Sequence, residues 1–371
     1  MEKPLKNLEI LLVKERLIEE AERLRDKSKY SESFALYKKA LNLSIKEDYK
    51  DDVFKCFYSL GNLSRMLGKF NDAINFYDKA IDCAKELKMR LYEADASVGL
   101  GLSLRAIGNL RDSMRLIKSS KVVYKKYNDS EGLAFTTWAE AGIYRVKGEI
   151  IKSLERFKEA RNIYRRIGDK QGEGYSLCGL GGASRVAGMF RKSLFYYSLA
   201  NDVFKSLKDV FGEAYSYCGI GNAYRMLFKI KEALENLRKA TKLYRRIGDK
   251  VSYAYTLWSI ASTYLLLGDY KVSKEYYNEA SELFRKTNDP RGKIYCYIGL
   301  GQLAYLNKKR NISISYVAKA KKDANNFGFL LESCHARVLL SLLEDKKIRL
   351  PSCYNQLGVK LRFNKLPINI P

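Results

Sequence analysis

The sequence is poor in proline and histidine and contains no long apolar run. Only 5 of its 371 residues are Pro, and Pro interrupts helices because it lacks an amide donor and clashes with the preceding turn. Long, uninterrupted helices are therefore favoured. His335 is the single histidine, which nearly excludes zinc sites and histidine-based acid–base catalysis. No segment approaches the roughly 18 consecutive apolar residues of a membrane helix, so we expect no membrane partner.

Acidic residues are also scarce, and the cysteines lack a recognisable pattern. Lys and Arg number 68 against 42 Asp and Glu, a net charge of +26, which favours anionic partners or a solvated basic surface. The seven cysteines are scattered without a C-x-x-C pair, which indicates free thiols in a reducing compartment. The N-terminal residues lack the apolar core and cleavage site of a signal peptide. The expected location is cytoplasmic.

What the sequence has instead is a repeat of forty residues. Each unit carries apolar residues in steps of three and four, which predicts two amphipathic helices. A period of this length is typical of a solenoid. We expect a helix pair near 8–47, seven more pairs from about 52 to 326, and a capping helix near 330–345. The predicted organisation is a solenoid over residues 1–345 and a basic tail over 346–371. A glycine of the first helix recurs in five units: Gly61, Gly101, Gly181, Gly221 and Gly301.

Two further columns predict how the helices begin and end. A second glycine, such as Gly68 or Gly148, follows the first helix of most units, where a left-handed helix end needs it. Ser28, Phe228 and Lys308 stand in that place in three units, so we expect those turns to close differently. An aspartate recurs at the unit boundary and is expected to cap the next helix: Asp129, Asp169, Asp209, Asp249 and Asp289.

These residues resemble the tetratricopeptide repeat. Ile220-Gly221 matches its Leu-Gly pair, Tyr224 its tyrosine and Ala233 its alanine. The forty-residue form with Gly-Asp turns is similar to the repeats of LGN/Pins-type scaffolds. The resemblance implies an all-α solenoid that forms a right-handed superhelix, whose first helices line a concave groove. It also implies a protein-interaction scaffold that is not an enzyme and uses no cofactor or metal.

The resemblance places several columns of side chains in that groove. Tyr215, Asn222 and Arg225 are separated by seven and three residues and therefore share one helix face. An arginine recurs in six consecutive units, starting at Arg25, and is the strongest candidate for function. The candidate groove residues are Arg65, Arg105, Arg145, Arg185, Arg225, Asn62, Asn222, Tyr175, Tyr215, Tyr255, Tyr295, Trp138 and Trp258.

A row of guanidinium groups repels itself unless anions balance it. Carboxylates of the protein would make the row structural, whereas a ligand would make it a binding site. We favour an acidic peptide or partner segment, because arginine binds carboxylates in a bidentate manner. The alternative is a polyanion or single-stranded RNA, with bases stacked on the tyrosines. A self-associating scaffold is a third possibility, and the sequence leaves the oligomeric state open.

Three local features carry expectations of their own. Glu140 replaces an apolar residue of the other units, so it should pair with Arg145 or Arg105 unless its helix is rotated. The pair Gly219 and Gly221 resembles part of a dinucleotide fingerprint but lies within a predicted helix, where close helix packing explains it. The tail from Lys346 lacks the period and is either extended or disordered. Because this tail is basic, its insertion into a basic groove is disfavoured.

Overall fold

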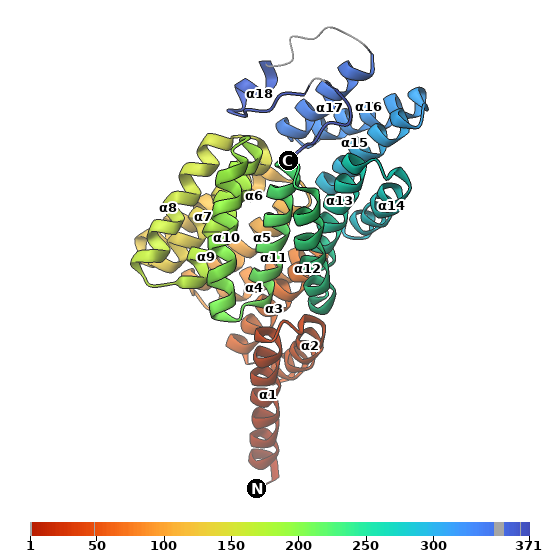
Figure 1. Cartoon of the computed structure of the whole chain (residues 1–371). Coiled ribbons are helices and arrows are strands. Elements are labelled where there is room, and N and C mark those ends of the chain that lie inside the picture. The colour runs from red at the N-terminus through yellow and green to blue at the C-terminus, as the bar shows by residue number, and fades with distance from the viewer. Residues whose placement is uncertain (1, 48, 345–351, 364) are drawn as a thin grey trace.

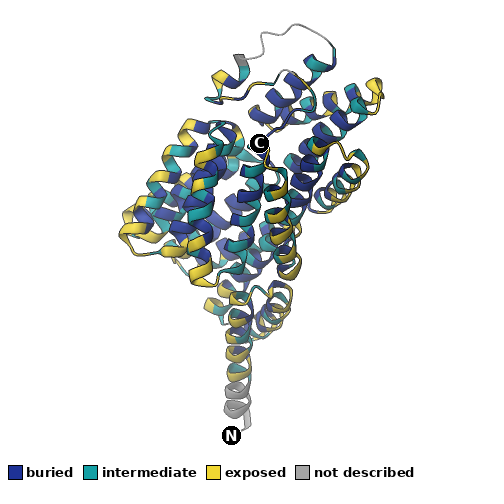
Figure 2. Ribbon diagram, viewed as in Figure 1, coloured by how far each residue is buried: buried dark blue, intermediate teal, exposed yellow. Residues whose placement is uncertain are grey.

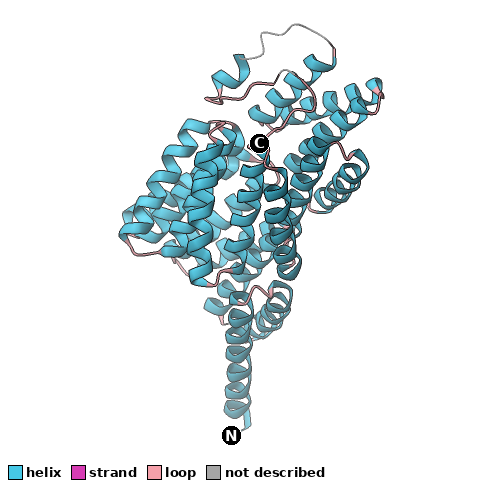
Figure 3. Cartoon of the chain, viewed as in Figure 1, coloured by secondary structure: helices cyan, strands magenta, loops and turns pink. Residues whose placement is uncertain are grey.

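The computed structural model describes residues 2–47, 49–344, 352–363 and 365–371. In these ranges the chain forms eighteen helices and no strand (Figure 3). The helices are α1 (Glu2–Asp26), α2 (Tyr30–Lys46), α3 (Lys50–Met66), α4 (Phe70–Glu86), α5 (Arg90–Ala106), α6 (Leu110–Lys126), α7 (Ser130–Lys147), α8 (Ile150–Arg166), α9 (Lys170–Val186), α10 (Phe190–Leu207), α11 (Val210–Met226), α12 (Ile230–Ile247), α13 (Lys250–Leu267), α14 (Tyr270–Lys286), α15 (Pro290–Leu306), α16 (Arg310–Asn326), α17 (Leu330–Leu343) and α18 (Ser352–Gln356).

Helices α1 to α16 form eight antiparallel pairs, each packed on the next, and α17 covers the last pair (Figure 1). The predicted all-α solenoid is confirmed. Odd-numbered helices also contact one another along the solenoid, so they form its inner layer. The even-numbered helices carry most of the exposed positions (Figure 2). None of the helices in the described ranges is long and apolar enough to cross a bilayer.

A large side chain of the second helix of a pair packs against glycines of the inner layer, both in its own pair and in the next. Tyr197 is the clearest case, because a Cβ atom added at Gly219 would lie 2.1 Å from its ring, and one at Gly181 would lie 2.7 Å away. The predicted packing role of the Gly219–Gly221 pair is confirmed, since Gly221 contacts Leu237 in the same manner. These contacts set the distance between the two layers.

The turns correct one expectation. Ser28, Phe228 and Lys308 have φ values of 58°, 58° and 60°, so they adopt the left-handed conformation that the glycines take in other units. All three turns therefore close in the same way as the others, despite the cost of a Cβ atom in that region. The aspartate caps are confirmed at all five positions: Asp129, Asp169, Asp209, Asp249 and Asp289 each accept a hydrogen bond from a backbone N–H of the following helix.

Glu140 is buried on an α7 that keeps its regular register. Its carboxylate is paired as expected, but with Lys121 of α6 rather than with Arg145 or Arg105. Lys121 Nζ lies 3.2 Å from one carboxylate oxygen, and the hydroxyl of Tyr144 donates to the other at 3.2 Å. The pairing therefore uses a lysine of the outer layer.

The solenoid closes on itself, so that the turns of early units touch late helices. A Cβ atom added at Gly68 would lie 3.1 Å from Thr287, and one at Gly108 would lie 2.6 Å from Phe327. The first hairpin joins this contact, because Tyr30 shares a buried cluster with Tyr244 and Ile247. The inner layer consequently surrounds a partly enclosed groove.

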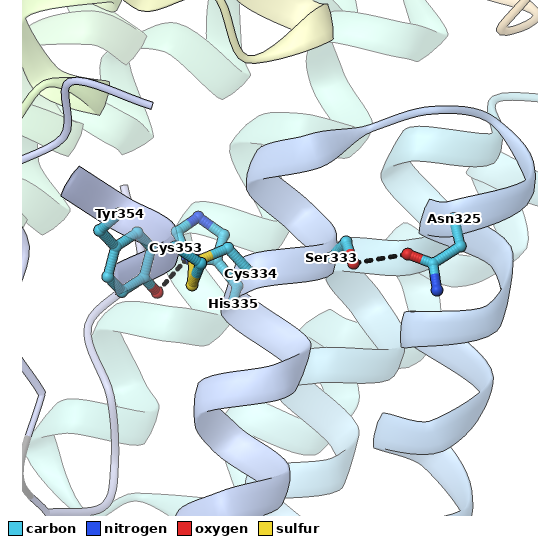
Figure 4. Close-up of a disulfide and its surroundings, with 6 residues drawn as sticks. All are labelled: Asn325, Ser333, Cys334, His335, Cys353 and Tyr354. Atoms are coloured by element: carbon cyan, nitrogen blue, oxygen red, sulfur yellow. Dashed lines mark hydrogen bonds between the residues drawn. A yellow bond between two sulfur atoms is a disulfide. The ribbon is translucent and has the colours of Figure 1, made fainter. Parts of the chain in front are cut away.

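The C-terminal residues correct two further expectations. Cys334 and Cys353 form a disulfide between α17 and α18 (Figure 4), so not all cysteines are free thiols. The tail then crosses the solenoid, where the N–H of Lys360 donates to the carbonyl of Ala187 at 3.0 Å. Residues 366–371, named here the tail segment, form part of the groove lining, and Ile368 and Ile370 pack in the same buried cluster as Trp258. The tail as a whole is basic, but the residues inserted into the groove carry no charged side chain.

Candidate binding groove

The predicted groove residues line one continuous inner surface. Two chambers make up most of it. The N-terminal chamber, of about 580 Å³, is lined by Arg65, Arg105, Asn62, Trp138, Tyr175 and Tyr215 among others. The central chamber, of about 310 Å³, is lined by Arg105, Arg145, Arg185, Asn222, Tyr215, Tyr255, Trp258 and Tyr295. Arg105 and Tyr215 belong to both chambers. Arg225 lies beyond the central chamber, against the tail segment.

Two arginines of the row, Arg105 and Arg145, each lie over a glycine of the next inner helix. A Cβ atom added at Gly142 would lie 2.3 Å from Arg105 Nη1, and one at Gly182 would lie 2.3 Å from Arg145 Nη1. The guanidinium groups therefore fill the space beside these two glycines. The glycines position the row within the groove.

The row from Arg65 to Arg225 has no carboxylate partner within the described ranges, whereas Arg25 lies 3.5 Å from Asp26. The Nε atoms of Arg65, Arg145 and Arg185 are buried and donate to no partner there. Burial and the neighbouring Arg145 and Arg65 lower the pKa of Arg105 to about 10. Burial and Arg185 lower the pKa of Arg225 to about 9. A bound anion would offset this cost of concentrated positive charge.

Arg225 is the most enclosed member, with no exposed surface. Its Nη2 donates to Asn222 Oδ1 at 3.0 Å, and its guanidinium carbon lies 5.3 Å from the centre of the Trp258 ring. Its remaining contacts are neutral oxygens of the tail segment, from Asn369 and Ile370. Arg225 thus holds its charge by hydrogen bonds and a cation–π contact alone.

The aromatic candidates have structural contacts of their own. The hydroxyl of Tyr175 donates to Asp209 at 2.9 Å, while its ring packs 4.8 Å from Phe204. Burial and Asp209 raise the pKa of Tyr175. The indole N–H of Trp138 donates to the carbonyl of Tyr175 at 3.2 Å, and that of Trp258 donates to Tyr295 at 3.1 Å. These side chains brace the inner helices and present only part of their rings to the chambers.

Among the remaining candidates, Asn62 accepts a hydrogen bond from the Tyr77 hydroxyl at 2.8 Å, so it is held by the second helix of its own unit. Tyr255 packs its ring 4.7 Å from Phe284. Tyr215 makes the loosest contact, an offset stack 6.4 Å from Phe211. Tyr215 is therefore the tyrosine best placed to meet a ligand, because it belongs to both chambers.

Sequence reasoning missed three features of this site. Gln302 was not among the candidate groove residues, and its side chain accepts a hydrogen bond from the tail segment. Arg291 faces the central chamber and pairs with Glu332 of α17 at 2.6 Å. The tail segment itself carried a signal, since isoleucines alternate with Asn369, as in an extended strand. No group of described His, Cys, Asp and Glu residues has the arrangement of a metal site.

Comparison with known proteins agrees with this architecture. A family model described as tetratricopeptide repeat matches residues 211–286. A search of curated protein sequences finds no match. Among solved structures, the Rap conjugation gene regulator of plasmid pLS20, in complex with the Phr* peptide, is 16% identical with a TM-score of 0.64, over 75% of each chain. A Rap protein complexed with Competence and Sporulation Factor is 14% identical with a TM-score of 0.61, over 93% of this chain and 98% of that one. Aspartyl phosphate phosphatase F from Bacillus subtilis is 16% identical with a TM-score of 0.55, over 78% and 75%. At sequence identities this low, the similarity shows that the fold is shared and nothing more.

Proposed function

Because this chain is a tetratricopeptide-repeat protein, we propose that it is a non-catalytic adaptor that binds an acidic, extended segment of a protein partner in its inner groove. The observation that carries the proposal is the row of guanidinium groups without carboxylate partners in the described chain. Two of the similar structures are complexes, one with the Phr* peptide and one with Competence and Sporulation Factor, which supports a groove used for ligands.

The spacing of the row suits a peptide. Packed helices lie about 8–10 Å apart, and an extended chain rises about 3.3 Å per residue. An acid at every third residue would therefore meet successive arginines. Each such contact would replace an unpaired buried N–H with a charge-assisted hydrogen bond. The two chambers share Arg105 and Tyr215, so one ligand can pass through both.

Single-stranded RNA remains the second candidate in this groove, since phosphates also pair with arginine. The packed rings of Tyr175 and Tyr255 disfavour it, because base stacking needs open aromatic faces. Phe204 lies 4.8 Å from the first ring and Phe284 lies 4.7 Å from the second. A cytoplasmic location is part of the proposal and is tested by cell fractionation, together with the oxidation state of Cys334 and Cys353.

Fluorescence anisotropy with defined probes tests the peptide proposal. The probes are a labelled peptide with Glu at every third position, its Gln analogue and labelled poly(U). The groove variant is Arg145→Gln with Arg185→Gln. The control is Arg191→Gln with Arg246→Gln, which removes the same charge from two exposed positions.

We expect the acidic peptide to bind saturably, and its affinity to fall about tenfold or more in the groove variant alone, as for one lost charge-assisted contact. An equal loss of affinity in both variants would show that the peptide responds to net charge and not to the groove arginines. Preferential binding of poly(U), with a steep dependence on salt, would replace the peptide with nucleic acid.

A further inference from the structure

The tail segment is bound as a peptide ligand would be. Ile368 and Ile370 are each 3% exposed and belong to the cluster that contains Trp258, Tyr277 and Ile298. They alternate with a polar residue, as the side chains of an extended chain do. The segment therefore anchors itself in the groove by two apolar side chains that are two residues apart.

The solenoid forms hydrogen bonds with both the backbone and the Asn369 side chain of the tail segment. The N–H of Ile368 donates to Gln302 Oε1 at 2.6 Å, and the carbonyl of Ile370 accepts from Arg225 Nη2 at 3.0 Å. Asn369 bonds Arg225 twice, since its amide donates to the Arg225 carbonyl at 3.0 Å and its Oδ1 accepts from the guanidinium. This site recognises the pattern apolar–Asn–apolar in an extended backbone.

The direction of the segment matters for what lies beyond it. Pro371 forms part of the wall of the central chamber, together with Arg105, Arg145 and Arg185. A chain that continued past the position of Pro371 would run along these arginines. The tail segment thus fills the apolar end of the groove, where it binds Arg225, and leaves Arg105, Arg145 and Arg185 without a carboxylate partner in the described part of the chain.

We propose that the tail segment occupies, within its own chain, the anchoring end of the partner-binding groove, and that the partner segment which displaces it has the pattern apolar–Asn–apolar–Pro followed by acidic residues. This inference rests on the proposed function. It requires the tail segment to leave the groove while the disulfide between Cys334 and Cys353 keeps α18 attached to α17. The partner gains the arginine contacts that the tail segment cannot make, which provides the driving force for exchange.

The test measures peptide binding to the full chain with its tail held or released. Ile368→Asp with Ile370→Asp releases the tail segment, and Asn369→Ala is a milder variant that adds no charge. The control, Val122→Asp with Ile312→Asp, makes the same charge change at two exposed positions. The probe is a labelled peptide of sequence Leu-Pro-Ile-Asn-Ile-Pro-Glu-Ser-Ser-Glu-Ser-Ser-Glu. A second probe replaces each Glu with Gln, and circular dichroism checks the fold of each variant.

We expect the acidic probe to bind the released variant about tenfold or more tightly than wild type, because only a fraction of wild-type grooves is vacant. The affinity of Asn369→Ala for this probe should lie between those of wild type and the released variant, and the control should bind it as wild type does. Equal affinity for wild type and both tail variants overturns the inference. If the acidic peptide without the Ile-Asn-Ile anchor binds saturably, but the anchored acidic probe binds wild type and the released variant equally, the proposed function stands and the inference fails. Equal binding of the Glu and Gln probes to the released variant supports the tail site and contradicts the acidic specificity.

Discussion

Glycine at a helix end can be required by its backbone conformation or by a close neighbour, and Gly168 and Gly188 distinguish these two requirements. Gly168 has a φ of 77° and no atom within 4 Å of an added Cβ, so only its backbone conformation requires glycine. Gly188 has a φ of 84°, and an added Cβ would lie 2.7 Å from the carbonyl oxygen of Lys360. Gly188 therefore also positions the tail on the solenoid.

We expect Gly168→Ala to lower the free energy of unfolding by about 1 kcal/mol, from left-handed strain alone. Gly188→Ala adds the clash with Lys360 and should cost at least about 2 kcal/mol. Thermal unfolding gives the two costs, and hydrogen exchange of residues 358–371 shows whether the tail has loosened. Equal exchange in both variants would mean that Gly188 does not hold the tail.

His335 makes stability depend on acid. Its imidazole is buried, and its Nδ1 lies 2.7 Å from the hydroxyl of Tyr354. Burial, followed by the nearby Arg291, lowers the pKa of His335 to about 3. The imidazole of an unfolded chain has a pKa near 6.5. Between these values the unfolded chain binds a proton that the folded chain excludes, so stability falls as the pH decreases from about 6.5 towards 3.

The decrease in the free energy of unfolding should approach about 1.4 kcal/mol per pH unit between about pH 6.5 and 3. His335→Gln removes this contribution, so its thermal midpoint should fall less than that of wild type between pH 7 and pH 4.5. Other groups titrate equally in the two proteins, and the difference between them isolates His335. Parallel pH curves would show that the imidazole is protonated in the folded state.

At the scale of elements, α6 and α7 share the ion pair of the half-buried Lys121 and the buried Glu140. Breaking a pair of this kind leaves an uncompensated charge, whereas replacing both partners with apolar residues is often neutral. We expect Lys121→Met to lower the free energy of unfolding by about 2 kcal/mol. Glu140→Leu, which restores the apolar residue of the other units, should be neutral or stabilising by about 1 kcal/mol.

Urea unfolding of the single variants and of the double variant checks this expectation. The double variant should regain the stability that Lys121→Met loses, since no buried carboxylate remains. A double variant as unstable as the single Lys121→Met would show that Lys121 contributes by packing of its aliphatic stem, and not by its charge.

The elements themselves were predictable because the repeat fixes them locally. Helix pairs, aspartate caps and glycine packing each depend on residues within one or two units of forty, and a period displays them repeatedly. The arginine row was found in the same way. The partner of Glu140 was not predicted correctly. Lys121 lies on the outer layer, and the sequence does not show whether a buried carboxylate pairs with a residue of the inner or of the outer layer.

The tail shows a second limit of the sequence. Its insertion depends on Gln302 and Arg225, which lie 66 and 144 residues from their partners in the tail segment. No period links such positions. The alternation of Ile368 and Ile370 around Asn369 indicated an extended strand, but not the surface that receives it. The prediction for the turns at Ser28, Phe228 and Lys308 was wrong for a different reason. The helices on either side impose a left-handed conformation that these residues disfavour.

At the scale of the whole molecule, the groove depends on contacts between distant turns of the solenoid. Tyr30, at the start of α2, is buried against α11–α13 and lines the N-terminal chamber together with Asp209. Burial raises the pKa of Tyr30, and Asp249 and Asp209 raise it further, which shows that an added negative charge is unfavourable at this position. The two walls of the chamber thus meet through a neutral side chain.

We expect Tyr30→Asp to separate the first hairpin from α11–α13, because the new carboxylate would be desolvated and repelled by Asp209 and Asp249. Each hairpin keeps its neighbour in the chain, so helix content should be retained while the radius of gyration rises. Small-angle scattering and circular dichroism measure the two quantities. Tyr127→Asp, at an exposed position, is the control and should change neither.

The same variant connects the shape of the molecule to its proposed ligand. Opening the N-terminal chamber would move Arg25, on the first hairpin, away from Tyr175 and Tyr215, which line the same chamber. The central chamber, formed by later units, would keep Arg145 and Arg185 in place. An acidic peptide long enough to reach both chambers should then bind Tyr30→Asp more weakly, while a peptide that spans the central chamber alone should bind as before. Equal weakening of both peptides would mean that the groove closes and opens as one unit.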